Sequence, residues 1–158
     1  MRIGFASDIH RLVKNRPLLL AGVNVPFELG EEAHSDGDVV YHAVSESILG
    51  ALALGDLGTH FPDTDDKYLN MDSSLIVKEV VSLMKSNNYH IGNIDVSITL
   101  ERPKLRPYVE QMRINLSKLL ETNIDNVSVK AGTNEKMDAL GQGLAVKAEA
   151  IVLLKEGK

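Results

Sequence analysis

The sequence of 158 residues contains no cysteine and no tryptophan, and only 4% of its residues are aromatic. Without cysteine the chain can form neither a disulfide nor a thiolate metal site, which leaves histidine and carboxylate side chains as its strong metal ligands. The absence of cysteine fits a reducing compartment. The core must be built mainly from Val, Ile, Leu and Ala.

Long apolar runs and an excess of basic residues are also missing. The longest apolar stretch near the N-terminus, Leu18–Ala21, is too short for a signal peptide or a membrane span. A net charge of −5 argues against a nucleic-acid partner, because binding phosphates by charge alone requires a basic face. We therefore expect a soluble, unexported protein with no membrane and no nucleic-acid partner.

The length fits a single domain, residues 1–158, with one compact core. Alternation of apolar and polar residues predicts strands with one buried face, because successive side chains of a strand point to opposite sides. These strands are predicted around Ile3 to Ile9 and at residues 18–25, 94–100, 127–131 and 144–154.

Three segments have the apolar spacing of helices. Residues 36–54 are apolar nearly all round, which predicts a helix buried on several sides. A second helix follows Asp72 and Ser73, either of which can serve as its N-cap, and a third runs through 109–120 with Pro107 in its first turn. Helices alternating with strands predict an α+β fold, an α/β sandwich with an about four-stranded mixed sheet and helices on one face.

A candidate metal site comes from two separate segments. Asp8 and His10 are two residues apart in the first predicted strand, so both side chains point to the same face. His42 lies in the second turn of the predicted buried helix. By themselves, such residues are more often a polar strand end and a satisfied core histidine than metal ligands. Together they would give a tetrahedral zinc ion three ligands and one open position, as catalytic zinc sites have.

Other polar segments allow two interpretations each. Ser35 followed by Asp38 resembles a capping box at the start of the predicted helix. Four carboxylates on a short loop either form Asx turns or accept the hydroxyls of a polyol. These carboxylates belong to Asp56, Asp63, Asp65 and Asp66. Arg102 and Lys104 lie at the end of the clearest strand, where they either belong to a solvated turn or contact a phosphate. Glu135 follows another strand, and its carboxylate is a hard oxygen ligand suited to Mg²⁺.

The order and spacing of these motifs resemble the 2-C-methyl-D-erythritol 2,4-cyclodiphosphate synthase family of the non-mevalonate isoprenoid pathway. The resemblance rests on Asp8-Ile9-His10, on His34-Ser35-Asp36-Gly37-Asp38 with His42, and on the segments 55–58 (Gly-Asp-Leu-Gly) and 61–65 (Phe-Pro-Asp-Thr-Asp). Residues 102–104, 129–131 and 133–136 extend it over almost the whole chain.

This resemblance implies conversion of 4-diphosphocytidyl-2-C-methyl-D-erythritol 2-phosphate to the 2,4-cyclodiphosphate and CMP. It implies one Zn²⁺ per site on Asp8, His10 and His42, a second metal, Mg²⁺ or Mn²⁺, on Glu135, and catalytic roles for His34 and Thr133 in holding the reacting phosphates. The implied substrate-binding residues are Asp8, His10, His34, Ser35, Asp56, Leu57, Gly58, Phe61, Pro62, Asp63, Thr64 and Asp65. The implied cytidine-binding residues are Leu100, Glu101, Arg102, Pro103, Lys104, Leu105, Ala131, Gly132, Thr133, Asn134 and Glu135.

Family members are homotrimers with each site between subunits, and the same is expected here. The expected location is the cytoplasm for a bacterial chain, or the stroma of a plastid or apicoplast for a processed eukaryotic chain. Ser7 and Gln142 depart from many bacterial members, which have an aromatic residue and Arg there. Because the family associates those two residues with isoprenoid diphosphates in the central cavity of the trimer, the resemblance makes no prediction of such binding.

Two rival functions use the same residues. A zinc phosphohydrolase would activate water at the open metal position. A non-catalytic ligand sensor would use the metal for structure only. In the synthase reaction the nucleophile is an ionised phosphate of the substrate, so the enzyme needs no nucleophile–base pair of its own. The cytidine segment and Thr133 favour the synthase over the hydrolase.

Overall fold

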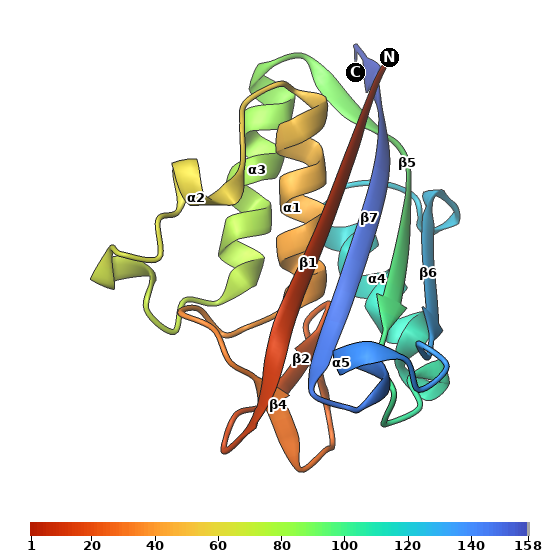
Figure 1. Ribbon diagram of the computed structural model, residues 1–158. Helices are drawn as coiled ribbons and strands as arrows, with labels where there is room; N and C mark the ends of the chain where they lie inside the picture. The colour runs from red at the N-terminus through yellow and green to blue at the C-terminus, as the bar shows by residue number, and fades with distance from the viewer. Residues whose placement is uncertain (158) are drawn as a thin grey trace.

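The computed structural model describes residues 1–157 and contains a five-stranded sheet with the order β4-β1-β7-β5-β6 (Figure 1). The strands are β1 (Arg2–Lys14), β4 (Leu29–Glu31), β5 (Tyr89–Thr99), β6 (Val127–Gly132) and β7 (Ala145–Glu156). Only β5 and β6 run parallel, and the other neighbours are antiparallel. The predicted mixed sheet is confirmed, with the short strand β4 in addition to the four longer ones.

The strand predicted at residues 18–25 is wrong in one respect. The segment forms two strands, β2 (Leu18–Leu20) and β3 (Val23–Val25), which pair with each other as a separate hairpin. The chain reverses at Ala21 and Gly22, whose φ angles are 49° and 74°. Two consecutive residues with positive φ make the tight turn whose twist suits a hairpin. The apolar run alone does not show this turn.

Three long helices, α1 (Val39–Ala51), α3 (Ser73–Ser86) and α4 (Val109–Leu119), pack on one face of the sheet, as predicted (Figure 1). α1 contacts β1 and β7, while α4 contacts β6. The shorter helical segments are α2 (Leu57–His60), α5 (Asp138–Gly141) and the 3₁₀ turns Asp66–Tyr68, Arg106–Tyr108 and Ile124–Asn126. Within residues 1–157, no helix is long and apolar enough to cross a membrane.

α1 is the central element of the core. All of its residues are buried except His42, Glu46 and Gly50. At the position of Gly4 in β1, an added Cβ atom would lie 1.8 Å from the carbonyl oxygen of Ser47. The absence of a side chain at Gly4 therefore lets α1 lie directly against β1. This close contact sets the positions of the polar groups that both elements carry.

The ends of the helices show which residues cap them. α1 begins at Val39 and ends at Ala51, not at 36 and 54, and His42 consequently lies in its first turn instead of its second. The predicted capping box of Ser35 and Asp38 is wrong, because Asp38 is itself the N-cap and accepts a hydrogen bond from the Tyr41 N–H. Asp72 caps α3, as predicted.

Candidate active site

The side chains of Asp8, His10 and His42 meet between β1 and α1. Asp8 and His10 lie on the helix-facing side of β1, in line with the buried residues Ala6 and Leu12. The Nε2 atom of His10 lies 3.2 Å from Asp8 Oδ2, and the Nδ1 atom of His42 lies 3.4 Å from the same oxygen. The two histidine nitrogens are 3.4 Å apart. The predicted convergence of these three side chains is confirmed.

These distances fit a tetrahedral zinc ion. Bonds of about 2.0–2.1 Å to nitrogen and oxygen place the ligand atoms of such an ion about 3.3–3.4 Å apart. The three separations in this structure, 3.2, 3.4 and 3.4 Å, match the edges of that tetrahedron. Within residues 1–157 this is the one group of three His or carboxylate side chains able to hold a single ion.

The protonation states also suit metal binding. Burial by itself would raise the pKa of Asp8, but hydrogen bonds and charge interactions with His10 and His42 outweigh burial and lower this pKa well below its usual range. Asp8 is therefore a carboxylate at neutral pH. The Nδ1 atom of His10 lies 2.7 Å from the carbonyl oxygen of Gly37, which can only accept. In the neutral ring Nδ1 therefore carries the hydrogen, and Nε2 has the lone pair that a metal needs.

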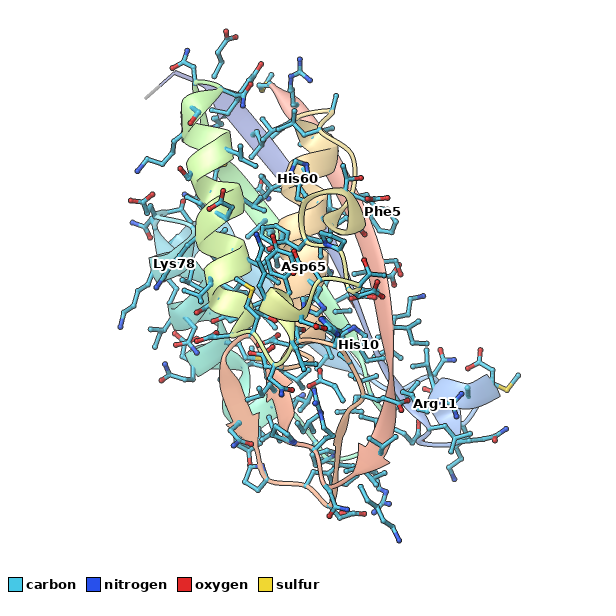
Figure 2. The ribbon with its side chains drawn as sticks, turned by 90° about the vertical axis from the view of Figure 1, so that its left-hand side faces the viewer. Phe5, His10, Arg11, His60, Asp65 and Lys78 are labelled. Carbon is cyan, nitrogen blue, oxygen red and sulfur yellow. The ribbon has the colours of Figure 1, made fainter. Side chains whose placement is uncertain are left out.

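Two loops lie beside this triad. The Nε2 atom of His34 is 3.1 Å from the backbone carbonyl oxygen of Asp65, and the Asn70 N–H donates to the His34 carbonyl at 2.7 Å. In Figure 2 the loop that carries Asp65 lies in front of α1, above the level of His10. The structure thus brings the predicted phosphate-binding residue His34 together with the loop predicted to bind the polyol.

The carboxylates of this loop have structural partners. Asp56 caps α2 and accepts hydrogen bonds from the backbone and the hydroxyl of Thr59, which lower the pKa of Asp56. Asp65 caps the turn at Asp66–Tyr68 through the Lys67 N–H. These contacts support the interpretation as Asx turns for both residues. Binding of substrate hydroxyls by this loop stays a prediction.

A second feature, an open cleft of about 1040 Å³, lies at the ends of β5 and β6. Eight of the eleven residues predicted to bind cytidine line this cleft: Leu100, Glu101, Pro103, Lys104, Leu105, Ala131, Gly132 and Thr133. Arg102, Asn134 and Glu135 do not line it. Arg102 instead lies 3.7 Å from Glu28 and over the Phe27 ring.

The triad and the cleft are separate in one chain. Across the sheet, Asp8 is paired with Ala148, Ala148 with Ile98, and Ile98 with Ala131. Three strand spacings separate Asp8 from Ala131, which corresponds to about 14 Å. Glu135 is exposed and does not belong to the triad. A single chain therefore presents the triad and the cleft on two different parts of its surface.

Sequence reasoning missed several residues of these features. In the cleft it missed Arg106 and Lys130, although both flank predicted positions, and Lys130 forms an ion pair with Asp95 at 2.7 Å. Beside the triad it missed the carbonyl of Gly37, for which side-chain chemistry gives no signal. It also missed Glu31, which is completely buried and accepts a hydrogen bond from the Val39 N–H at the start of α1.

The fold and the triad define a class of protein: an α+β domain in which two histidines and one carboxylate, able to hold a metal ion, meet between the sheet and the central helix. The particular family follows from comparison with known proteins. The chain belongs to the YgbB family, whose sequence model matches residues 1–155.

Known relatives span the entire chain. The 2-C-methyl-D-erythritol 2,4-cyclodiphosphate synthase of Brachyspira hyodysenteriae is 52% identical over 158 residues, which cover 100% of both proteins. A solved 2C-methyl-D-erythritol-2,4-cyclodiphosphate synthase in its CDP-bound form is 36% identical, with a TM-score of 0.90 over 98% of this chain and 100% of that one. The bifunctional IspDF of Campylobacter jejuni is 36% identical, with a TM-score of 0.94 over 98% of this chain but only 42% of that one.

Proposed function

We propose that this protein converts 4-diphosphocytidyl-2-C-methyl-D-erythritol 2-phosphate to 2-C-methyl-D-erythritol 2,4-cyclodiphosphate with release of CMP. The observation that carries the proposal is the triad of Asp8, His10 and His42 in a chain 52% identical, end to end, to a synthase of that name. The bacterial origin of that relative supports a cytoplasmic location.

The triad is proposed to hold one Zn²⁺, and Glu135 to bind Mg²⁺ or Mn²⁺ together with the substrate phosphates. Such cations, when bound, neutralise the charge that develops on the phosphates. The donor set supports zinc, because two neutral imidazoles and one carboxylate at tetrahedral spacing are ligands that zinc accepts. Carboxylate oxygen at Glu135 suits a harder ion.

The chain's own residues have a positioning task. An oxygen of the 2-phosphate forms a bond to the β-phosphorus, and the bond from that phosphorus to the oxygen of CMP breaks. Because the attacking oxygen is already ionised, no general base is needed. His34 and Thr133 are proposed to hold the phosphates, and the loop 56–65 to hold the erythritol unit, so that the two groups meet in line. The CDP-bound form of the solved relative supports cytidine binding in the cleft.

A homotrimer with each site between two subunits is part of this proposal. In one chain the triad and the cleft lie about three strands apart, about 14 Å. The sheet face opposite the helices carries the exposed apolar residues Ile3, Phe5, Ile9 and Ile151. Contiguous exposed apolar residues are typical of interfaces. Packing these faces together would allow the triad of one subunit to lie beside the cleft of the next.

The proposal is tested with purified protein and the cytidyl substrate, following CMP and the cyclic product by ³¹P NMR. We expect equal amounts of both products. His42→Ala should remove the bound zinc and turnover together, because two ligands do not form a catalytic zinc site. The matched control is His90→Ala, since His90 lies near the start of β5, contacts the Gly157 carbonyl outside all proposed site segments and should leave both unchanged. No CMP from the wild-type protein, or full zinc content in His42→Ala, would reject the assignment.

A further inference from the structure

The Nε2 atom of His42, on the opposite side of the ring from Asp8, contacts two serine hydroxyls. Ser73 Oγ lies 3.0 Å away and Ser35 Oγ lies 3.1 Å away. Ser73 is completely buried and is the first residue of α3, so the helix fixes the place of its hydroxyl group. Neither serine is one of the three candidate ligands.

The direction of these hydrogen bonds is set by Asp36. Ser73 Oγ lies 2.5 Å from Asp36 Oδ1, and a carboxylate can only accept a hydrogen bond. The single hydroxyl hydrogen of Ser73 therefore goes to Asp36. Ser73 Oγ then offers only lone pairs to His42, so Nε2 must carry a hydrogen and donate it. In a neutral imidazole this leaves the lone pair on Nδ1, the atom that faces Asp8 and His10.

Asp36 is itself held in place by the backbone. It accepts hydrogen bonds from the Ser73 N–H at 3.0 Å and the Asp38 N–H at 3.1 Å. The Asp36 N–H donates to the Met71 carbonyl at 3.0 Å. The orientation of Asp36 is therefore fixed from both the loop that precedes α1 and the start of α3.

We propose that Asp36 and Ser73 are positioning residues that hold the His42 ring in its Nε2–H tautomer, with Nδ1 presented to the metal. The inference rests on the proposed metal site. Partners on the second nitrogen of a ligating histidine fix its tautomer and the orientation of its ring, and their loss typically weakens metal binding about 10–100-fold. Ser73, at the start of α3, thus controls the tautomer of His42, a proposed metal ligand 31 positions earlier in the chain.

The test replaces Ser73 and reads the tautomer directly. In Ser73→Ala, the hydroxyl of Ser35 remains and can donate its hydrogen to Nε2, which would stabilise the Nδ1–H tautomer instead. Metal-free, full-length protein with ¹⁵N-labelled imidazoles is measured by NMR at a pH above the imidazole range. We expect Nε2–H for His42 in the wild type and a shift toward Nδ1–H in Ser73→Ala. Zinc affinity, measured by competition with a chelator, should fall about 10–100-fold.

Ser74→Ala is the matched control, because Ser74 occupies the next position of α3 and its backbone N–H is bonded to Asp72. It should retain the wild-type tautomer and affinity. Nδ1–H in the wild-type protein overturns the proposal without any variant, even where Ser73→Ala fails to fold. Zinc affinity of Ser73→Ala within twofold of Ser74→Ala also overturns it. Failure of the wild type to bind zinc while His42 is Nε2–H would instead reject the metal site and leave the hydrogen-bond arrangement standing.

Discussion

Glu31 and Asp38 place two carboxyl groups inside the protein, next to the loop that carries His34. Glu31 is completely buried and accepts hydrogen bonds from the backbone N–H groups of Leu19 and Val39. Burial, together with the nearby charge of Asp38, raises the pKa of Glu31 to about 10. Glu31 is therefore protonated at neutral pH in the folded protein, while its unfolded form ionises near 4.5.

This difference predicts how stability depends on pH. Between the unfolded pKa of 4.5 and the folded pKa of about 10, the folded protein binds one more proton at Glu31 than the unfolded chain. The free energy of unfolding therefore falls as pH rises through this window, by up to about 1.4 kcal/mol per pH unit from this group. The free energy of unfolding, measured with urea at several pH values, should therefore decrease less steeply with pH in Glu31→Gln than in the wild type. The exposed neighbour Glu32 provides the control, and Glu32→Gln should keep the wild-type slope. Equal slopes in wild type and Glu31→Gln would contradict the assignment.

At the scale of single residues, the sequence predicted contacts that follow from local spacing. Asp8 and His10 converge because they are two residues apart in one strand, and His42 was identified because a histidine is unusual in so apolar a helix. The contact of Ser73 with Asp36 joins residues 37 positions apart. No local pattern encodes it, because it depends on how α3 packs beside the loop before α1.

At the scale of elements, the close packing of α1 on β1 positions His42 over Asp8. Replacing Gly4 with Ala would put a Cβ atom 1.8 Å from the Ser47 carbonyl and 2.8 Å from the Ala51 nitrogen. Both atoms belong to the α1 backbone, so the helix must move. We expect Gly4→Ala to lower the free energy of unfolding by about 1–3 kcal/mol, the usual cost of overpacking.

Gly50, on α1 itself, is the control for this substitution. An added Cβ atom there lies 3.9 Å from the nearest atom, the Phe5 carbonyl oxygen. Gly50→Ala should therefore stabilise the protein by about 0.5–1 kcal/mol, since alanine favours the helix. Urea unfolding of both variants measures the difference. A Gly4→Ala variant as stable as the wild type would show that α1 does not depend on this contact.

Element types were predictable where periodicity is long, as in β5, β7, α3 and α4. Boundaries and turns were not. The apolar run at 18–25 hides a hairpin, since its turn depends on the backbone angles of Ala21 and Gly22. The start of α1 depends on Asp38, whose carboxylate also accepts hydrogen bonds from the Ala21 and Gly22 N–H groups in that turn. Tertiary contacts thus decide where the helix begins.

At the scale of the whole molecule, the open face of the sheet predicts self-association. Phe5 is 57% exposed and lies directly opposite Ile151, which is 52% exposed, in the β1–β7 pair. Figure 2 shows Phe5 on β1, at the margin of the molecule. Phe5→Glu would place charges within the proposed trimer interface, so light scattering should show a single-chain mass for the variant and three chains for the wild type.

Leu75→Glu is the control for this measurement. Leu75 is 47% exposed on α3, away from the sheet face, and its replacement should leave three chains. A single-chain mass for the wild-type protein would contradict the trimer. Loss of association in both variants would show that the interface is not confined to the sheet.

The central claim is that the substrate's own 2-phosphate, and not water, attacks the β-phosphorus. Well-oriented intramolecular groups reach effective molarities of about 10⁵–10⁸ M, so a correctly folded substrate leaves water little opportunity to react. The most direct measurement is turnover of the cytidyl substrate in H₂¹⁸O, followed by mass spectrometry of both products. We predict CMP and 2-C-methyl-D-erythritol 2,4-cyclodiphosphate that contain no ¹⁸O. One ¹⁸O atom in CMP or in a linear diphosphate product would show that the protein is a hydrolase.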